Sequence, residues 1–324
     1  AAATSRKLSG KEIVDHINSA NVGWTAKFHE KSERRTMMRH SGLAQIPKGI
    51  EVEYRPDPPR SELDELPVSF DARDKWPACT TIGKIRDQSR CGACWAFSAA
   101  EALSDRACIA SNAAINVELS AQDLLECCGM HCGFGCDGGV PILAWFFMRN
   151  DGVCTSGGYY EQEGCKPYYN EPCGTHTVNG VQHYHNCSHL ADPDTPNCQK
   201  GCLNANYKTG YRADKHFAAS AYAVKFDEEF IRHEIYNNGP VQVGFTVFED
   251  FDYYHGGIYK HTYGDDIGGH AVKIIGWGEE AGQKYWLIAN QWNTDWGENG
   301  FFRMIRGIND CGIEMGVVAG LAKV

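Results

Sequence analysis

The stretch from Gln88 to Ser98 contains two cysteines, Cys91 and Cys94, with a Gly-Ala pair between them and a tryptophan directly after. Helix-forming residues with apolar positions at helical spacing continue to Ala107, so we expect Cys94 at the start of a helix. Unpaired backbone N–H groups at a helix start favour the thiolate, which is the nucleophilic form of a cysteine. On spacing alone, a CxxC redox pair or a structural disulfide is an equal alternative.

Two later segments supply groups that could activate this thiol. His270 stands at the head of a β-branched strand pattern, and Asn290 follows a second apolar strand pattern. A cysteine nucleophile needs a base, and the base needs a third group that fixes its tautomer and orientation. Cysteine, histidine and asparagine in this order, with C-G-A-C-W around the nucleophile, match the signature of papain-type proteases. The three motifs together predict a cysteine protease.

The chain from about Leu66 to Ala319 resembles papain-like cysteine proteases, and within them the cathepsin B group carried with its propeptide. The resemblance also rests on four further segments: Leu66–Arg73, Cys127–Gly129, Cys136–Gly139 and Asp192–Pro196. It implies an α+β, papain-like fold of two lobes, one helical and one β-barrel-like, with the active-site cleft between them. The implied domains are a short helical inhibitory propeptide, 1–65, and a protease domain, 66–324. The helical lobe would be mainly 79–215 and the β lobe mainly 216–324.

Local patterns agree with two such lobes. Ser120 is expected to cap a helix that ends at Cys128, Pro141 to open a helix through Arg149, and Asp227 to start a helix that ends at Asn238. Strand-like runs follow at 241–248, 257–260, 270–277, 284–290 and 300–306. The nucleophile and its base would therefore lie on different lobes.

The resemblance assigns a role to each catalytic position. Cys94 and His270 would form a thiolate–imidazolium pair, with Asn290 orienting the imidazole. Gln88 and the Cys94 backbone N–H would stabilise the charge that develops on the carbonyl oxygen. Trp292 would cover the Asn290–His270 bond and keep water from it.

The substrate-binding positions also follow from the resemblance. Gly138 and Gly139 would let a substrate backbone lie close, because neither carries a side chain. The acidic position of the cathepsin B S2 pocket falls on Gly316, so the pocket would be apolar and without a countercharge. The remaining implied contacts are Gly92, Pro141, His176, Gly244 and Ala271.

The segment between Cys173 and Cys187 matches the loop that closes one side of the cathepsin B cleft with two adjacent histidines. A single histidine, His176, stands where two are expected, and the aspartate to which such a loop is pinned matches Asp87. Loss of one charged contact would loosen the loop. We therefore expect mainly endopeptidase activity, with weak dipeptidyl-carboxypeptidase activity.

Fifteen cysteines indicate an oxidising compartment. The relatives imply six disulfides: Cys79–Cys108, Cys91–Cys136, Cys127–Cys198, Cys128–Cys132, Cys165–Cys202 and Cys173–Cys187. Cys154 and Cys311 are left over and could form a seventh bridge or both be free. The Cys and His spacings fit no zinc-ligand pattern, so neither a metal nor another cofactor is expected. Asn186 begins an N-x-S glycosylation sequon.

Composition limits the possible partners. A formal charge of −10 argues against nucleic acid, and no apolar run is long enough to span a membrane. The expected partners are peptide and protein substrates, the chain's own propeptide and cystatin-like inhibitors, with the protease itself a monomer. The resemblance implies a lysosomal or endosomal location reached through the secretory pathway.

Residues 1–65 differ from the rest in charge, with 11 Lys and Arg against 10 Asp and Glu, compared with 20 against 31 in 66–324. A capping box at Ser9–Glu12 predicts a helix with an apolar face. Trp24 and Phe28, one helical turn apart, could dock on another surface. The cationic side chains expected to pair with the acidic body are Arg34, Arg35 and Arg39. The Pro-rich stretch from 55 to 65 is expected to be an exposed linker suited to proteolytic removal.

Two residues depart from the family pattern beside functional positions. Asp137 replaces an asparagine before the glycine pair, and Gln291 replaces a serine after Asn290. Neither change removes a reacting group. A catalytically silent papain-fold binding protein is the alternative, and a disulfide-exchange protein that uses Cys91 and Cys94 is a third hypothesis.

Overall fold

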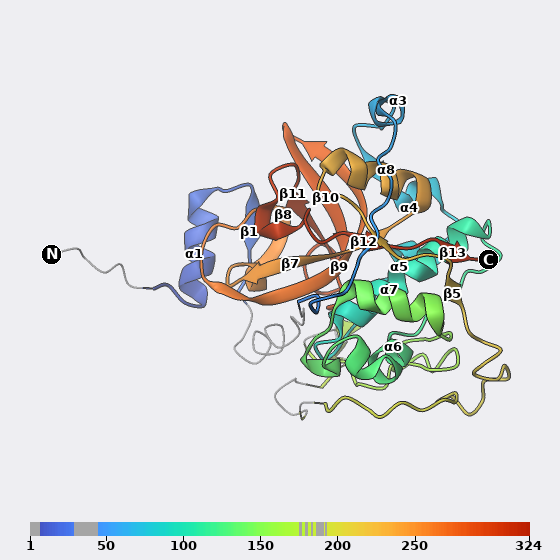
Figure 1. The fold of residues 1–324 in the computed structure, drawn as a ribbon. Coiled ribbons are helices and arrows are strands. Elements are labelled where there is room, and N and C mark those ends of the chain that lie inside the picture. Colours follow the sequence, from blue (N-terminus) through green and yellow to red (C-terminus); the bar gives the residue numbers. More distant parts are fainter. Residues whose placement is uncertain are drawn as a thin grey trace.

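The computed structural model describes residues 7–28, 45–174, 177–178, 181–182, 184–185, 191 and 193–324. Figure 1 shows most of the helices gathered on one side of the molecule, a large sheet next to them, and the N-terminal helix at the far edge of that sheet. The α-helices are α1 (Lys11–Ala20), α3 (Arg60–Asp64), α4 (Ala72–Lys75), α5 (Cys94–Ala110), α6 (Ala121–Cys127), α7 (Pro141–Asn150) and α8 (Glu228–Asn238).

The main sheet has nine strands in the order β1-β8-β11-β10-β9-β7-β12-β6, with β2 paired to β9. The strands are β1 (Trp24–Ala26), β2 (Phe70–Asp71), β6 (Tyr222–Ala223), β7 (Val241–Phe248), β8 (Tyr254–Tyr259), β9 (Asp266–Glu280), β10 (Gln283–Ala289), β11 (Phe301–Ile305) and β12 (Val318–Ala319). Two short pairs lie outside it: β3 (Thr177–Val178) with β4 (Val181–Gln182), and β5 (Phe217–Ala218) with β13 (Ala322–Lys323). The path starts at β1 and ends at β6. Over the described residues the sheet is therefore open, and the barrel-like lobe is not a closed barrel.

The predicted helix starts follow from capping chemistry. The Ser120 hydroxyl accepts the Asp123 N–H at 3.0 Å, and the Asp227 carboxylate accepts the Glu229 N–H at 2.8 Å. Pro141 opens α7, where its missing N–H costs no hydrogen bond. One apolar core lies under the sheet and a second lies among α5, α6 and α7. The predicted strand runs correspond to β7, β8, β9, β10 and β11, and most differ from them by a few residues at the ends.

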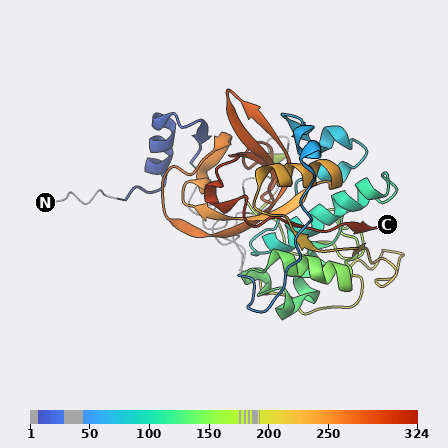
Figure 2. The ribbon, with the colours of Figure 1, turned by 45° about the horizontal axis from the view of Figure 1, so that its top comes forward.

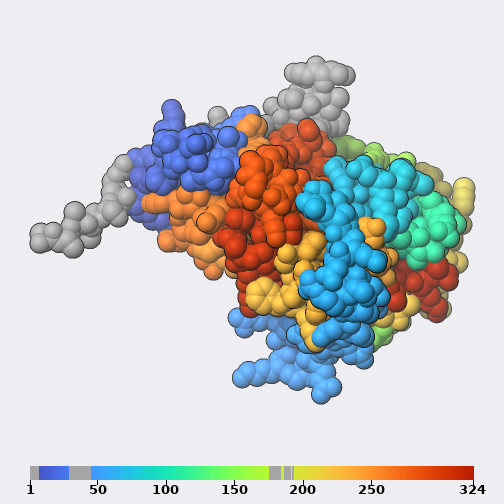
Figure 3. Space-filling view, turned by 90° about the horizontal axis from the view of Figure 1, so that it is seen from above, coloured from blue at the N-terminus to red at the C-terminus, as the bar shows by residue number. Residues whose placement is uncertain are grey.

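The N-terminal segment packs on the far edge of the sheet, as Figure 2 shows. The helix α1 buries Ile13, Val14 and Ile17, as its periodicity predicts. The helical interpretation of Trp24 is wrong, because Trp24 lies in β1 and pairs with Gly257 of β8. Its ring lies 5.1 Å from that of Tyr259. In Figure 3 this segment, in dark blue, rests directly on the orange strands of the β lobe.

The stretch expected to be an exposed linker is partly ordered against α8. Residues 60–64 form α3, and Leu63 is buried. Arg60 forms an ion pair with Glu229 at 2.6 Å, and His233 Nε2 lies within hydrogen-bond distance of Glu62 Oε2, at 2.7 Å. Polar contacts and one apolar anchor therefore hold this stretch to the protease body.

Five of the implied disulfides are present: Cys79–Cys108, Cys91–Cys136, Cys127–Cys198, Cys128–Cys132 and Cys165–Cys202. Cys173 is also disulfide-bonded, while its expected partner Cys187 lies outside the described residues. The possible seventh bridge is not formed, because Cys154 and Cys311 are both free thiols. The Cys154 N–H is held by Asp123 of α6, whereas the Cys311 thiol lies beside Asp310 in the β lobe.

Candidate active site

The expected nucleophile is the first residue of the longest helix. Cys94 begins α5, and its side chain is a thiol and not part of a disulfide. Its neighbour in the CxxC motif, Cys91, is bridged to Cys136, which rules out a Cys91–Cys94 redox pair. The position at the N-terminus of a 17-residue helix favours a thiolate there.

The expected base lies in β9 and is oriented by Asn290. His270 Nε2 lies 2.8 Å from Asn290 Oδ1, which also accepts the Gln291 backbone N–H at 2.9 Å. An oxygen that accepts a backbone N–H fixes the amide orientation, so the neutral imidazole carries its proton on Nε2. His270 Nδ1 is buried and has no hydrogen-bond partner among the described residues. Its lone pair is therefore available to take a proton from a nucleophile.

Trp292 shields this pair from water. Its ring stacks on His270 with centroids 4.8 Å apart and planes inclined by 26°. Trp292 itself is buried, and so are His270 and Asn290. A hydrogen bond in such a dry environment is stronger than one exposed to water.

Burial also controls the charge of the base. Loss of hydration lowers the pKa of His270 to about 4, and the Asn290 hydrogen bond offsets only part of that effect. The imidazole is therefore neutral at neutral pH in this form. Cys94 and His270 both have 0% exposure, so neither side chain contacts solvent in this form.

Gln88 links the nucleophile segment to the segment that follows Asn290. Its backbone N–H donates to Gln291 O at 3.0 Å, and its Nε2 donates to Cys91 O at 3.0 Å. Its own carbonyl accepts the Tyr168 hydroxyl at 2.8 Å. The Gln88 amide is thereby fixed beside the turn that leads into Cys94, where an oxyanion donor is required.

Sequence reasoning missed the groups that join α5 to the sheet. Lys273 Nζ lies 2.7 Å from Asp105 Oδ2, and both side chains are fully buried. Gln242 of β7 donates to Trp95 O and to Ser98 Oγ, each at 2.8 Å. A lysine inside the run Ala271–Trp277 and an aspartate on an apolar helix are unusual, which signals that each needs a buried partner but does not identify that partner.

Three implied substrate contacts, Gly92, Gly138 and Gly139, lie beside the start of α5. Gly138 has φ 111°, which a side chain would strain, and a Cβ on Gly139 would lie 2.5 Å from the Trp95 ring. The Gly92 N–H donates to Cys136 O at 2.8 Å, so the segment before Gly138 is hydrogen-bonded to the turn that leads into Cys94.

Some of the residues expected around the S2 pocket lie close together. Gly244 pairs with Ala271 across β7 and β9, and a Cβ on Gly316 would lie 3.6 Å from the Gly244 carbonyl oxygen. Pro141 is the first residue of α7, and His176 lies outside the described residues.

The two departures from the family pattern differ in surroundings. Asp137 is exposed. Gln291 is fully buried, and neither of its side-chain amide atoms has a hydrogen-bond partner in the described part of the chain. Burying an amide in this way is unfavourable, and nothing in the structure explains it.

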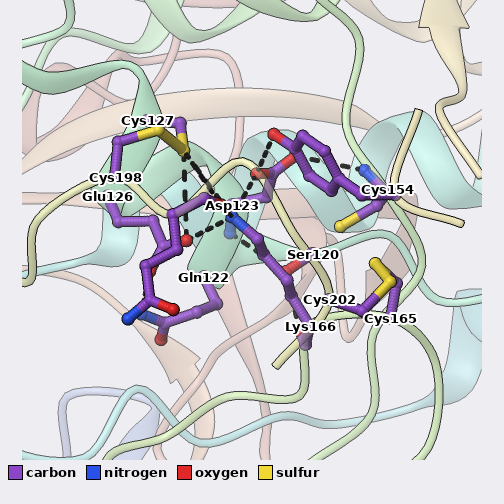
Figure 4. A network of polar contacts seen from close by, with 12 residues as sticks. Ser120, Gln122, Asp123, Glu126, Cys127, Cys154, Cys165, Lys166, Cys198 and Cys202 are labelled. Carbon is purple, nitrogen blue, oxygen red and sulfur yellow. Dashed lines mark hydrogen bonds and ion pairs between the residues drawn. A yellow bond between two sulfur atoms is a disulfide. The ribbon is translucent and has the colours of Figure 1, made fainter. Parts of the chain in front are cut away.

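Among the described residues, two groups of acidic and cysteine side chains lie close together, and each includes a cysteine that is already in a disulfide. Figure 4 shows one of them, Asp123, Glu126 and Cys127, and Lys166 lies among the three. Lys166 Nζ lies 2.9 Å from Asp123 Oδ1 and also contacts Glu126. The ammonium group takes the place that a cation would need, so this network is structural.

Comparison with known proteins decides the family. Residues 66–321 match the family described as "Papain family cysteine protease". The chain belongs to the papain family of cysteine proteases. This member of the family is 48% identical over 316 residues to "Cathepsin B-like cysteine proteinase 4" of Caenorhabditis elegans, a match that covers 96% of this chain and 92% of the relative. It is 49% identical to "Cathepsin B-like cysteine proteinase 5" of the same organism, covering 97% and 90%.

The solved structure of "proCathepsin B S9 from Trypanosoma congolense" is similar to this papain-family protease with a TM-score of 0.81 and 35% identity. That similarity covers 98% of this chain and 99% of the other, so it includes the N-terminal segment. The predicted cysteine protease and its papain-like α+β fold are confirmed. In the described part of the chain, no helix is both long and apolar enough to cross a membrane.

Proposed function

We propose that the chain is the zymogen of a cathepsin B-like cysteine endopeptidase that works in an acidic lysosomal or endosomal compartment, reached through the secretory pathway. The His270–Asn290 pair under Trp292 carries this proposal, because it holds one imidazole nitrogen and leaves the other available for a proton. Residues 66–324 would be the protease and 1–65 the propeptide.

The reaction follows from these roles. The Cys94 thiolate attacks the scissile carbonyl carbon, and the charge on its oxygen is stabilised by the Cys94 N–H and the Gln88 amide. His270 then gives its proton to the leaving amine, the C–N bond breaks and a thioester remains on Cys94. A water molecule, deprotonated by His270, attacks the thioester. The carboxylic acid is released, and the Cys94 thiolate and the His270 imidazolium are restored.

The propeptide would act as an intramolecular inhibitor. The full burial of Cys94 and His270 supports this. The ionic docking expected through Arg34, Arg35 and Arg39 falls outside the described residues. In the described part of 1–65, docking combines the apolar face of α1 and the Trp24 ring with ion pairs. Lys7 pairs with Asp265 at 2.6 Å and Glu249 at 3.2 Å, and Arg60 pairs with Glu229 at 2.6 Å.

The proposed enzyme would act as a monomer on peptide and protein substrates and would be blocked by cystatin-like inhibitors. Asn186, which lies outside the described ranges, would be glycosylated. Dipeptidyl-carboxypeptidase activity would be weak, as the single His176 predicts.

An active-site epoxide probe tests the proposed function. After removal of the propeptide, labelling of Cys94 together with peptidase turnover is expected. A folded protein that neither labels nor turns over would instead be a silent binding protein.

A further inference from the structure

The later part of the proposed propeptide pairs with an edge of the main sheet. The strand path of that sheet ends at β6. The Ala223 N–H of β6 donates to Glu53 O at 2.8 Å, and Ala223 O accepts the Arg55 N–H at 2.8 Å. Tyr54, between these two residues, pairs with Ala223 in a parallel bridge. Removal of the propeptide would leave both backbone groups of Ala223 open to another extended segment.

The Arg55 side chain reaches a site made of a carboxylate and an aromatic ring. Arg55 Nε lies 3.4 Å from Glu234 Oε2, and the guanidinium carbon lies over the Tyr222 ring, 5.2 Å from its centre. Glu234 and Tyr222 are both buried. A buried carboxylate beside an aromatic face suits a planar guanidinium, which can form an ion pair and stack at the same time.

Groups of the protease body hold this carboxylate in place. Arg106 Nη1 and the Tyr222 hydroxyl donate to Glu234 Oε1 at 2.9 Å and 2.6 Å, and Asn238 Nδ2 donates to Glu234 Oε2 at 3.0 Å. These donors all belong to residues 66–324, so the carboxylate keeps its orientation when residues 1–65 are removed. A carboxylate oxygen has two lone pairs, so Oε2 can accept a further donor where Arg55 lies.

Residues on both sides of Arg55 extend the contact. Val52 is half-buried and packs against the apolar core among α5, α6 and α7, whereas Glu53 and Tyr54 are exposed. A cavity of about 280 Å³ beside Arg55 is lined by Pro56, Pro58 and side chains of α8, among others. The surface therefore contacts an apolar residue, an arginine three positions later and the prolines that follow.

This surface lies away from the catalytic residues. Arg106 is twelve residues after Cys94 on α5, which places it about 18 Å along the helix axis. A segment bound here would not occupy the place of the scissile bond. The protease body carries 20 Lys and Arg against 31 Asp and Glu, so its charge favours a cationic ligand.

We propose that the surface vacated by residues 52–58 is a second peptide-binding site of the processed enzyme. It takes an extended segment in which an arginine follows an apolar residue by three positions. The proposal rests on the proposed removal of residues 1–65. A protein substrate that carries such a segment would be held at two places, which lowers KM and leaves kcat unchanged.

Binding of a labelled peptide tests this site. The protein is the folded Cys94→Ser chain from which an added protease has removed the propeptide, so it needs no activity of its own. The probe is a fluorescent peptide with the sequence of residues 51–58. Three matched probes carry Arg55→Ala, Arg55→Lys or an N-methyl group on the Arg55 nitrogen. The intact chain is the control, because its own segment occupies the site.

We expect the probe to bind the processed protein with a Kd of about 0.1 mM or lower. The intact chain should bind at least about ten-fold more weakly, since its tethered segment competes at a high effective concentration. Arg55→Ala should weaken binding at least about ten-fold and the N-methyl group about five-fold. Arg55→Lys should weaken it about three-fold, because lysine keeps the charge but not the planar group.

Three binding results would overturn the proposal. The first is equal binding of the parent probe and the Arg55→Ala probe. The second is displacement of the probe by an excess of a Phe-Arg peptide amide, which would place it in the cleft. The third is self-association of the processed protein without probe binding, which would assign the edge of β6 to a second copy of the chain.

A pair of quenched substrates tests the effect on turnover by the processed wild type. Both have the same cleavage site, joined by a flexible linker to the sequence of residues 51–58 or to its Arg55→Ala version. The first should have a KM at least about five-fold lower, with kcat within about two-fold. Equal KM values would overturn the role in substrate binding. Absent turnover of both substrates would contradict the protease proposal, while probe binding still decides whether the second site exists.

Discussion

Lys273 and Asp105 form an ion pair in the interior, 2.7 Å long, with neither side chain exposed. Lys273 lies three residues after His270 on β9, and Asp105 lies on the helix that Cys94 begins. The pair therefore joins the two elements that carry the base and the nucleophile. It fixes how α5 lies on the sheet.

Removing one partner of this pair should be strongly destabilising. We expect Lys273→Met to lower the free energy of unfolding by about 3–5 kcal/mol, because it leaves the Asp105 carboxylate buried and unpaired. Urea unfolding of the disulfide-intact protein measures this. Lys284→Met is the control, since Lys284 is about half exposed and should matter by less than about 0.5 kcal/mol. An equal loss of unfolding free energy in both variants would show that the buried pair contributes no more to stability than an exposed lysine does.

Asn290 should matter for rate more than for stability. Asn290→Ala removes the acceptor that fixes the His270 tautomer, so kcat of the processed enzyme should fall about 10- to 100-fold with little change in KM. Asn206→Ala, at an exposed position, should leave kcat unchanged. A kcat within about two-fold of the wild type would mean that the ring is held without Asn290.

Acid should open the latent form. The pKa of His270 is lowered by burial to about 4 in the closed form and returns toward 6.5 when the ring regains water. Between these values the open form binds a proton that the closed form does not, so opening becomes easier as the pH falls through this window. The rate at which an epoxide labels Cys94 in the uncleaved chain, divided by the rate in the processed enzyme, should rise as the pH falls from 7 to 4. A flat ratio would argue against this coupling.

The S2 pocket should reject arginine. The resemblance puts Gly316 at the base of this pocket, and with glycine there an arginine would be buried without a countercharge. We expect kcat/KM for a Phe-Arg reporter to exceed that for an Arg-Arg reporter by at least about 10-fold. A side chain at 316 has room, because a Cβ at this position would lie 3.6 Å from its nearest neighbouring atom. Gly316→Glu should therefore raise Arg-Arg cleavage about 10-fold, while Met315→Glu, at the exposed neighbour, should not. Comparable cleavage of the two reporters by the wild type would refute the assignment.

Carboxydipeptidase activity should be weak. A peptide with a free C-terminus and its amidated twin should be cleaved at similar rates by the processed enzyme. Strong preference for the free acid, with stepwise release of dipeptides, would show that the single histidine is sufficient.

Local chemistry predicted much of this fold. Ser120 and Asp227 cap their helices as expected, and Cys94 starts α5, because capping and helix periodicity depend on neighbours in the sequence. The strand conformation of Trp24 could not be predicted from its neighbours in the sequence. Its spacing from Phe28 suits a helix, but the edge of β8, more than 200 residues away, pairs with it as a strand.

The candidate active site likewise has a part that the sequence predicts and a part that it does not. The order of Cys94, His270 and Asn290 is visible in the sequence, whereas the contacts that position them are not. Lys273–Asp105 and Tyr184–Asn293 join residues more than 100 positions apart. Such pairs depend on the packing of whole elements, which a single sequence does not specify.

The central claim is tested most directly by measuring peptidase activity on a Phe-Arg reporter before and after acid treatment, with Cys94→Ser in parallel. The intact chain should be nearly inactive at pH 7. After acid processing, peptidase activity should rise at least about 100-fold and the epoxide should label Cys94. The Cys94→Ser variant should stay inactive. Full activity of the uncleaved chain at pH 7, or turnover by Cys94→Ser, would contradict the account.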